Sequence, residues 1–336
     1  MSKFRKNKSV LENIILELKE NIRKISTTSN EIPKFAFICG RQVFDEDGNY
    51  KSEEILVNEK NKRHFLMKQF ESLSKMGKYG YRNVVSVISE KLYQNEEIDI
   101  LTFEELLAEI SDDIIIIVES MGTACELGAF TIKNRYIDKV TVINQKKHAQ
   151  DKSFLNDGPI KKIKSIDDGQ RVIIVKNSYY MNKGSKDFRD FVERTIGKEV
   201  DIIPNKDENN ILLKSMIYEL LNLIELFGPL YQNDLFELYK YFKGFSHYKL
   251  KDRDKHKINT SSQIIELMKN MGLISVTDKC ISISPNITCY NAMFTISQDS
   301  FQRYRLKAFC KPSSKHYIIQ AIINEDNDKT NSERCN

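Results

Sequence analysis

The chain has 336 residues, of which 40% are hydrophobic and 29% are charged, and a formal net charge of +5 at pH 7. This length allows two domains, each with its own core. No apolar run reaches the roughly 18 residues of a membrane span, and no apolar segment follows the basic N-terminus. We therefore expect a cytoplasmic protein without membrane contact. The six cysteines form no C-x-x-C pair and no cluster with histidine, which argues against structural zinc and against a disulfide framework.

The first 199 residues carry the pattern of a Rossmann-like α/β domain. A helix is expected within residues 8–27, where apolar residues recur at helical spacing. Strand patterns follow at 35–39, 83–88, 113–118, 139–144 and 171–176, and helical patterns lie between them at 59–76, 102–110 and 124–134. Alternation of this kind produces βαβ units and a parallel sheet. We assign residues 1–199, including the first helix, to one domain.

The second half predicts a smaller α+β domain after a polar linker at 200–210. Helices are expected at 211–227, 233–242 and 261–271, with a basic loop at 249–257. A hairpin follows within 273–284, turning at 277–279, and a last helix spans 300–309. This order indicates a winged-helix-like domain over 211–323. The polar segment 324–336 is expected to be disordered.

One segment, DIIIIVESMGTACELGAF at 113–130, concentrates the polar candidates. Its β-branched start predicts a strand buried on both faces. Gly122 then allows a tight turn, Thr123 caps the next helix, and Glu126 lies in the first helical turn. Cys125 is interpreted as a small buried hydrophobic residue. Such a strand–turn–helix unit directs its loop to the carboxyl end of the sheet, where ligands bind, so Glu119 and Glu126 indicate chemistry there.

The same residues resemble a known family. The Gly-Thr-x-x-Glu followed by Leu-Gly-Ala is similar to the nucleophile motif of nucleoside 2-deoxyribosyltransferases. Together with FAFICG at 35–40 and KSFLNDGPI at 152–160, it resembles the deoxyribosyltransferase-like effectors of bacterial retrons over about the first half of the chain. That resemblance implies an antiphage toxin that cleaves the N-glycosidic bond of NAD or a related nucleotide. NAD would be the substrate, with no cofactor and no metal.

The resemblance also implies partners: a homo-oligomer held by a retron reverse transcriptase and its RNA-linked single-stranded DNA. The lysines within 161–164 and the basic loop at 249–257 are candidate phosphate contacts. Charge runs of this kind are also found simply solvated.

Roles for the motif residues follow from the resemblance. Glu126 matches the nucleophile, which attacks C1′ of the sugar. Glu119 could hold a ribose hydroxyl or position a water. Ser120, Gly122 and Thr123 would offer hydroxyl and backbone N–H groups to a hydroxyl or phosphate. The competing interpretation of Glu126 is a first-turn carboxylate stabilised by the helix dipole.

Three other regions complete the candidate site. Cys39, Gly40 and Arg41 stand where the family contacts the nucleoside, and Arg41 could bind phosphate. Glu90 would contact the base or sugar, or else be a solvated charge at a strand end. Asn156 would lie near the ribose, from the same or a neighbouring subunit, or else form a turn.

Two alternative functions stay open at this point. The chain could be a housekeeping deoxyribosyltransferase or nucleoside hydrolase of nucleotide metabolism, although such enzymes need only about the first 160 residues. It could also be a non-catalytic regulator that senses a nucleotide and binds DNA.

Overall fold

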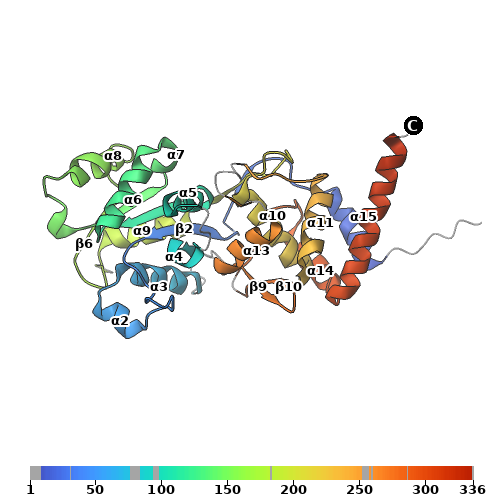
Figure 1. The fold of residues 1–336 in the computed structure, drawn as a ribbon, viewed down its shortest axis with the longest axis horizontal. Coiled ribbons are helices and arrows are strands. Elements are labelled where there is room, and N and C mark those ends of the chain that lie inside the picture. The colour runs from blue at the N-terminus through green and yellow to red at the C-terminus, as the bar shows by residue number, and fades with distance from the viewer. Residues whose placement is uncertain are drawn as a thin grey trace, which may run out of the picture. The chain divides into compact units, whose positions relative to one another are not determined.

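The computed structural model describes residues 9–30, 32–75, 84–93, 98–181, 184–251, 257–258, 260–285 and 287–334. The chain divides into two compact units (Figure 1). The sheet unit is Pro33–Val200, and the helical unit combines Met1–Ile32 with Asp201–Asn336. The division lies near residue 200, and the first helix belongs to the helical unit and not to the sheet unit.

A five-stranded parallel sheet forms the centre of the sheet unit. Its strands, in the order β3-β2-β4-β5-β6, are β2 (Lys34–Cys39), β3 (Val84–Val87), β4 (Asp113–Ile117), β5 (Val140–Gln145) and β6 (Val172–Val175). All five predicted strands are therefore confirmed, although Asn83 lies outside the described residues. Every residue of β2, β4 and β5 is buried, as unbroken apolar runs in a parallel sheet require.

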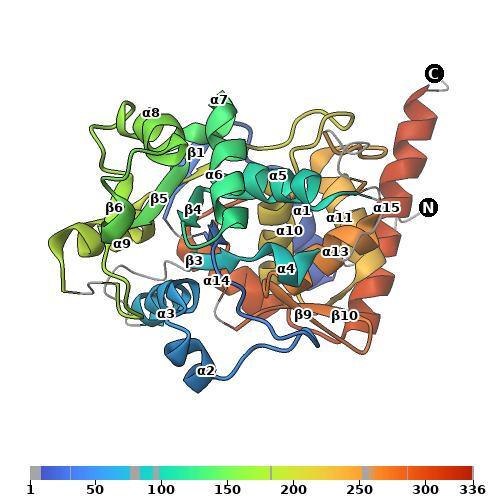
Figure 2. The ribbon, with the colours of Figure 1, turned by 60° about the vertical axis from the view of Figure 1, so that its left-hand side comes forward.

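Helices cover both faces of this sheet. They are α2 (Glu53–Asn58), α3 (Lys62–Lys75), α4 (Ser89–Leu92), α5 (Ile100–Ile110), α6 (Met121–Ile132), α7 (Asn134–Ile137), α8 (Lys161–Lys164) and α9 (Lys186–Gly197), with a 3₁₀ turn at Lys146–His148 and a π-helical turn at Asn156–Ile160. On one face α3 and α9 share a core with the sheet. On the other face lie α5 and α6 (Figure 2). There Phe130 of α6 packs edge-on against Phe37 of β2.

Among its described residues, the helical unit combines helices with a small antiparallel sheet in the order β8-β10-β9. Its elements are α1 (Val10–Lys19), α10 (Leu213–Phe227), β8 (Leu230–Tyr231), α11 (Gln232–Lys243), α13 (Ser261–Asn270), β9 (Ile274–Thr277), β10 (Cys280–Ile283), α14 (Gln298–Lys307) and α15 (Pro312–Arg334). Short strands β1 (Thr27–Ser29) and β7 (Val200–Ile202) pair with each other. Residues 252–256 of the expected basic loop lie outside the described residues. None of the described helices is long and apolar enough to cross a membrane.

The first helix packs on α14 and α15. Leu11, Ile14, Ile15 and Leu18 of its apolar stripe are buried as predicted, but the helix ends at Lys19 rather than near residue 27, and Ile25 is 72% exposed. The hydroxyl of Tyr304 donates to Glu17, and Thr295 N–H donates to Asn21 O at 2.8 Å. Amphipathic spacing predicts that a face is buried, not which core it covers. This is why the assignment of residues 8–27 to the first domain was wrong.

The segment expected to be disordered is instead the end of α15, which continues to Arg334. No glycine or proline follows Pro312, and Ile319 and Ile322 are buried near its start. Once packing has fixed the first turns of a helix, each further residue adds one hydrogen bond, so extension costs little free energy.

The predicted hairpin turn is confirmed, and it is strained. Thr277 pairs with Cys280, so Asp278 and Lys279 form a two-residue loop with φ of 51° and 65°. Both values are those of a type I′ turn, in which the second position prefers glycine.

Replacing Lys279 with glycine should therefore stabilise the hairpin by about 0.5–1 kcal/mol, because it removes left-handed strain from a side-chain-bearing residue. Hydrogen exchange of the β9 and β10 amides would measure the change. Lys269→Gly, on α13, is the control and should cost about 1 kcal/mol. Faster hairpin exchange in Lys279→Gly would contradict the turn assignment.

Candidate active site at the carboxyl end of the sheet

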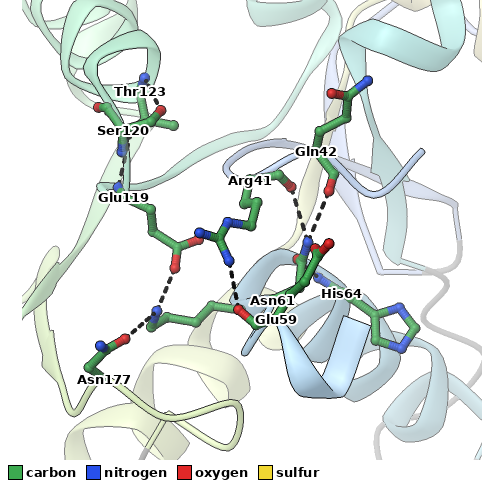
Figure 3. Close-up of polar contacts among 10 residues, drawn as sticks. Arg41, Gln42, Glu59, Asn61, His64, Glu119, Ser120, Thr123 and Asn177 are labelled. Carbon is green, nitrogen blue, oxygen red and sulfur yellow. Dashed lines mark hydrogen bonds and ion pairs between the residues drawn. The ribbon is translucent and has the colours of Figure 1, made fainter. Parts of the chain in front are cut away.

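The turn between β4 and α6 is built by Ser120, not by Gly122 and Thr123 as predicted. Ser120 is the N-cap, and its Oγ accepts the Thr123 N–H at 3.3 Å. Thr123 Oγ1 in turn accepts the N–H groups of Glu119 and Ser120, both at 3.1 Å (Figure 3). Both residues are good caps by type, and the reciprocal capping box selects the earlier one. Gly122 consequently lies within the first helical turn and has no positive φ.

This earlier start moves Glu126 into the second turn of α6, so its prediction in the first turn was wrong. Burial raises the pKa of Glu126, although the Cys39 thiol, which donates a hydrogen bond to it, and the Arg63 charge oppose the rise. Helix-dipole stabilisation would lower that pKa and fades beyond the first turn. The Oε2 atom of Glu126 is buried and hydrogen-bonds no other described residue. The carboxylate therefore does not have the surroundings of a helix-stabilising charge.

Arg63, near the start of α3, is the cation whose charge acts on this carboxylate, and the sequence analysis missed it. Its side chain is 1% exposed, and its guanidinium donates to both Glu90 oxygens, at 2.7 and 2.8 Å. Burial alone would raise the pKa of Glu90, but these hydrogen bonds and the Arg63 charge lower it below its ordinary value. Glu90 is thus an ion-paired carboxylate and not the freely solvated charge of the alternative interpretation.

Gly40 makes this approach of α3 possible. A Cβ atom at Gly40 would lie 3.1 Å from Arg63 Cβ, and the Gly40 carbonyl accepts from Arg63 Nη1 at 3.4 Å. The glycine at the end of β2 therefore matters because it lets Arg63 pack against the strand end.

A third carboxylate, Glu104 on α5, also belongs to this cluster. Its residue is 6% exposed, and burial, followed by the negative charge of Glu126, raises its pKa to about 7. Ser89 hydrogen-bonds Glu104 and donates to Glu90 Oε2 at 3.3 Å. One signal in the sequence marked it: Glu104 shares a helix face with Leu107 and Ala108, where a charge is costly.

Glu119 lies in a separate buried pair. Its carboxylate pairs with Lys62, and Lys62 Nζ also donates to Asn177 Oδ1 at 3.3 Å. Figure 3 shows Asn177 and Glu119 on the two sides of this contact. The second Glu119 oxygen, Oε2, is buried and hydrogen-bonds no described residue. The charge that couples directly to Glu126 is therefore that of Glu90 or Glu104 rather than Glu119.

Asn61 fixes the start of α3, which carries both cations. Its Oδ1 accepts the His64 N–H at 3.0 Å and its Nδ2 donates to Gln42 O at 3.0 Å. Arg41 is exposed, and its Nη1 donates to Glu59 O at 2.7 Å (Figure 3). The loop after β2 is thereby tied to the helix that presents Lys62 and Arg63.

The structure also shows the surroundings of Asn156 and Cys125. Asn156 Nδ2 donates to the carbonyls of His148 and Asp151 at 2.8 and 2.7 Å, and its Oδ1 accepts from Asn144 at 3.3 Å. It therefore organises the loop after β5. Cys125 is exposed, so its interpretation as a buried residue was wrong. Among the described residues, no group of His, Cys, Asp and Glu is arranged to hold a metal ion.

The model of the STM3845 retron effector protein family matches residues 59–276, about two thirds of the chain, and the chain belongs to that family. It is also similar to an Escherichia coli protein named "Retron Ec73 putative ribosyltransferase/DNA-binding protein". The two are 28% identical over 243 residues, which cover 65% of this chain and 70% of the relative.

Glu104→Gln should change how stability depends on pH. A carboxyl with a folded-state pKa of about 7 and an ordinary value of 4.5 favours folding at low pH, and that contribution is lost as pH rises to about 7. The glutamine variant has no ionisable group at this position, so its stability does not fall in this way. Its free energy of unfolding, relative to wild type, should therefore rise by up to about 3 kcal/mol between pH 4.5 and 8.

Urea denaturation across this pH range measures the difference. Glu54→Gln, at an exposed position of α2, is the matched control and should track the wild type. If Glu104→Gln also shows the pH dependence of the wild type, the pKa of Glu104 has its ordinary value and Glu104 does not belong to a coupled cluster.

Proposed function

We propose that this retron effector is an antiphage toxin that cleaves the N-glycosidic bond of NAD or a related nucleotide, with Glu126 as nucleophile. The observation that carries the proposal is the Glu126 carboxylate at the carboxyl end of the sheet. It is partly desolvated, has one oxygen without a hydrogen bond among the described residues, and neighbours a buried arginine. The relative's name, which includes ribosyltransferase, agrees with this class of reaction.

The chemistry follows from the charges. A Glu126 oxygen attacks C1′ while the C1′–N bond breaks, which leaves a glycosyl ester on the enzyme. In NAD the bond electrons neutralise the pyridinium ring, so nicotinamide departs neutral without receiving a proton. Water then attacks C1′, releases Glu126 and gives up a proton. Arg63 supports the first step because its positive charge opposes the rise in the pKa of Glu126.

The remaining candidates have assignable tasks around this step. Glu90, oriented by both guanidinium nitrogens of Arg63, would accept a hydrogen bond from a sugar hydroxyl or base. Glu119, anchored by Lys62, would hold a ribose hydroxyl through its second oxygen. Ser120 is exposed at the N-terminus of α6, a position suited to a hydroxyl or phosphate, and Arg41 is the exposed cation suited to phosphate.

One observation favours a second substrate class, nucleosides or nucleotides that lose a purine or pyrimidine. These bases leave more readily when they are protonated, and Glu104, with a pKa of about 7, is a carboxyl that still carries a proton near neutral pH. The proton of Glu104 would reach the leaving base by way of Ser89, which hydrogen-bonds both Glu104 and Glu90. Chromatography of the products distinguishes nicotinamide release from release of a base.

The helical unit is proposed to hold the effector on its retron partners. Its order of helix α10, strand β8, helices α11 and α13 and hairpin β9–β10 is that of a winged helix, and the relative is also named a DNA-binding protein. We propose that this unit contacts the reverse transcriptase and its RNA-linked single-stranded DNA, and that the chain is homo-oligomeric.

Glu126→Gln should reduce turnover of NAD, or of the nucleotide actually cleaved, by at least about 10³-fold, because an amide is a poor nucleophile. Growth toxicity should disappear with it. Circular dichroism should show an unchanged fold, and Glu54→Gln should keep full activity. Wild-type turnover by purified Glu126→Gln protein would remove Glu126 as nucleophile.

A further inference from the structure

The end of the helical unit carries an unusual concentration of positive charge. Residues 300–324 contain five lysines and arginines and no aspartate or glutamate. This segment covers α14 from Ser300 onward and the first half of α15, and it is flanked by Asp299 and Glu325. The whole chain has a net charge of only +5, so five cations in one segment make the electrostatic potential around that segment positive.

Two of these five cations serve the fold. Lys315 is fully buried and donates to the carbonyls that end α10, those of Phe227 and Gly228. Arg305 approaches Glu225 at 3.9 Å. The other three, Arg303, Lys307 and Lys311, are exposed.

Large apolar side chains are exposed among these cations. Leu306 is 77% and Phe309 is 79% exposed, whereas Phe301, Tyr304 and Ala308 on the opposite side are buried. Arg303, Leu306 and Lys307 have the i, i+3, i+4 spacing that places side chains on one helix face. Phe309 follows at the helix end, where its N–H donates to Leu306 O at 3.4 Å. We call Arg303, Leu306, Lys307, Phe309 and Lys311 the α14 surface.

The helix expected to enter DNA grooves in a winged helix, α13, is much less basic. Its exposed residues include Ser262, Gln263 and Lys269, and Lys269 is paired with Glu266 at 3.3 Å. The α14 surface therefore combines exposed cations with an exposed aromatic ring. The described residues of α13 do not offer this combination.

We infer that the α14 surface binds single-stranded nucleic acid. Unpaired bases stack on Phe309 and Leu306, and Arg303, Lys307 and Lys311 contact the phosphates. A duplex hides its base faces and would set these apolar side chains against phosphate, so single strands are favoured. The inference rests on the proposed nucleic-acid contact of the helical unit and adds its location and strandedness.

The test uses the full chain and fluorescence anisotropy with a labelled oligothymidine at several salt concentrations. Arg303→Gln/Lys307→Gln should weaken binding at least about tenfold. It should also reduce the salt slope by about 1.4, because each phosphate contact to a single strand contributes about 0.7. Phe309→Ala should weaken binding about 5- to 100-fold at an unchanged slope, because stacking releases no counterions. A parallel titration with oligouridine tells DNA from RNA.

Lys186→Gln/Arg189→Gln, which removes two exposed cations of α9 that have no part in any proposed contact, is the matched control and should bind like wild type. Three results would overturn the inference. Unchanged binding by both α14 variants, with loss in Lys269→Gln, would move the contact to α13 and leave the proposed function standing. Tighter binding of a duplex of the same length would exclude the single-strand preference. Failure of the wild type to bind either probe at low salt would remove the proposed nucleic-acid contact itself.

Discussion

Two consecutive buried cations at the start of α3 constrain the whole candidate site. Lys62 and Arg63 are each 1% exposed in their side chains, at a helix end where positive charge is unfavourable. They are tolerated because each meets a carboxylate from a different strand end, Glu119 after β4 and Glu90 after β3. Breaking either pair would leave an uncompensated buried charge, which costs several kcal/mol. Helix α3 and the ends of strands β3 and β4 are thereby held together by electrostatics as well as by packing.

This arrangement also explains why the carboxylates of the site behave differently. Glu90 is held ionised by direct hydrogen bonds from Arg63, whereas Glu104 and Glu126 feel burial without such a pair, so their pKa values rise. Pairs of acids whose pKa values are pushed apart by their surroundings are the usual basis of acid and nucleophile assignments. One buried arginine therefore separates the roles within a single cluster, and the protons of the cluster titrate as a coupled set.

The sequence predicted the sheet because β4 is an unbroken β-branched run, which favours a buried parallel strand. The other strands are short, largely apolar segments that alternate with helical patterns. It also identified Glu126 through the motif, but not the surroundings that give this carboxylate its properties. Arg63 and Glu104 lie outside the motif. The apolar helix face around Glu104 marks it as an unusual charge, but the ion pair of Arg63 and the coupling of Glu104 to Glu126 come from tertiary neighbours that no local pattern encodes. The helix start was misplaced because Ser120 and Thr123 are both acceptable caps, and their mutual hydrogen bonds decide between them.

The most direct test of the account is to trap the glycosyl–enzyme ester. The substrate is a nucleotide that carries fluorine at C2′ of its sugar, because the fluorine destabilises the oxocarbenium-like transition states of both steps. A good leaving group still allows the first step, so the ester should accumulate. Intact-mass spectrometry followed by peptide mapping would locate the adduct. We expect one sugar per chain on the Glu126 carboxylate. An adduct on Glu90, Glu104 or Glu119, or cleavage that proceeds with no adduct at all, would contradict Glu126 as the nucleophile at the centre of this site.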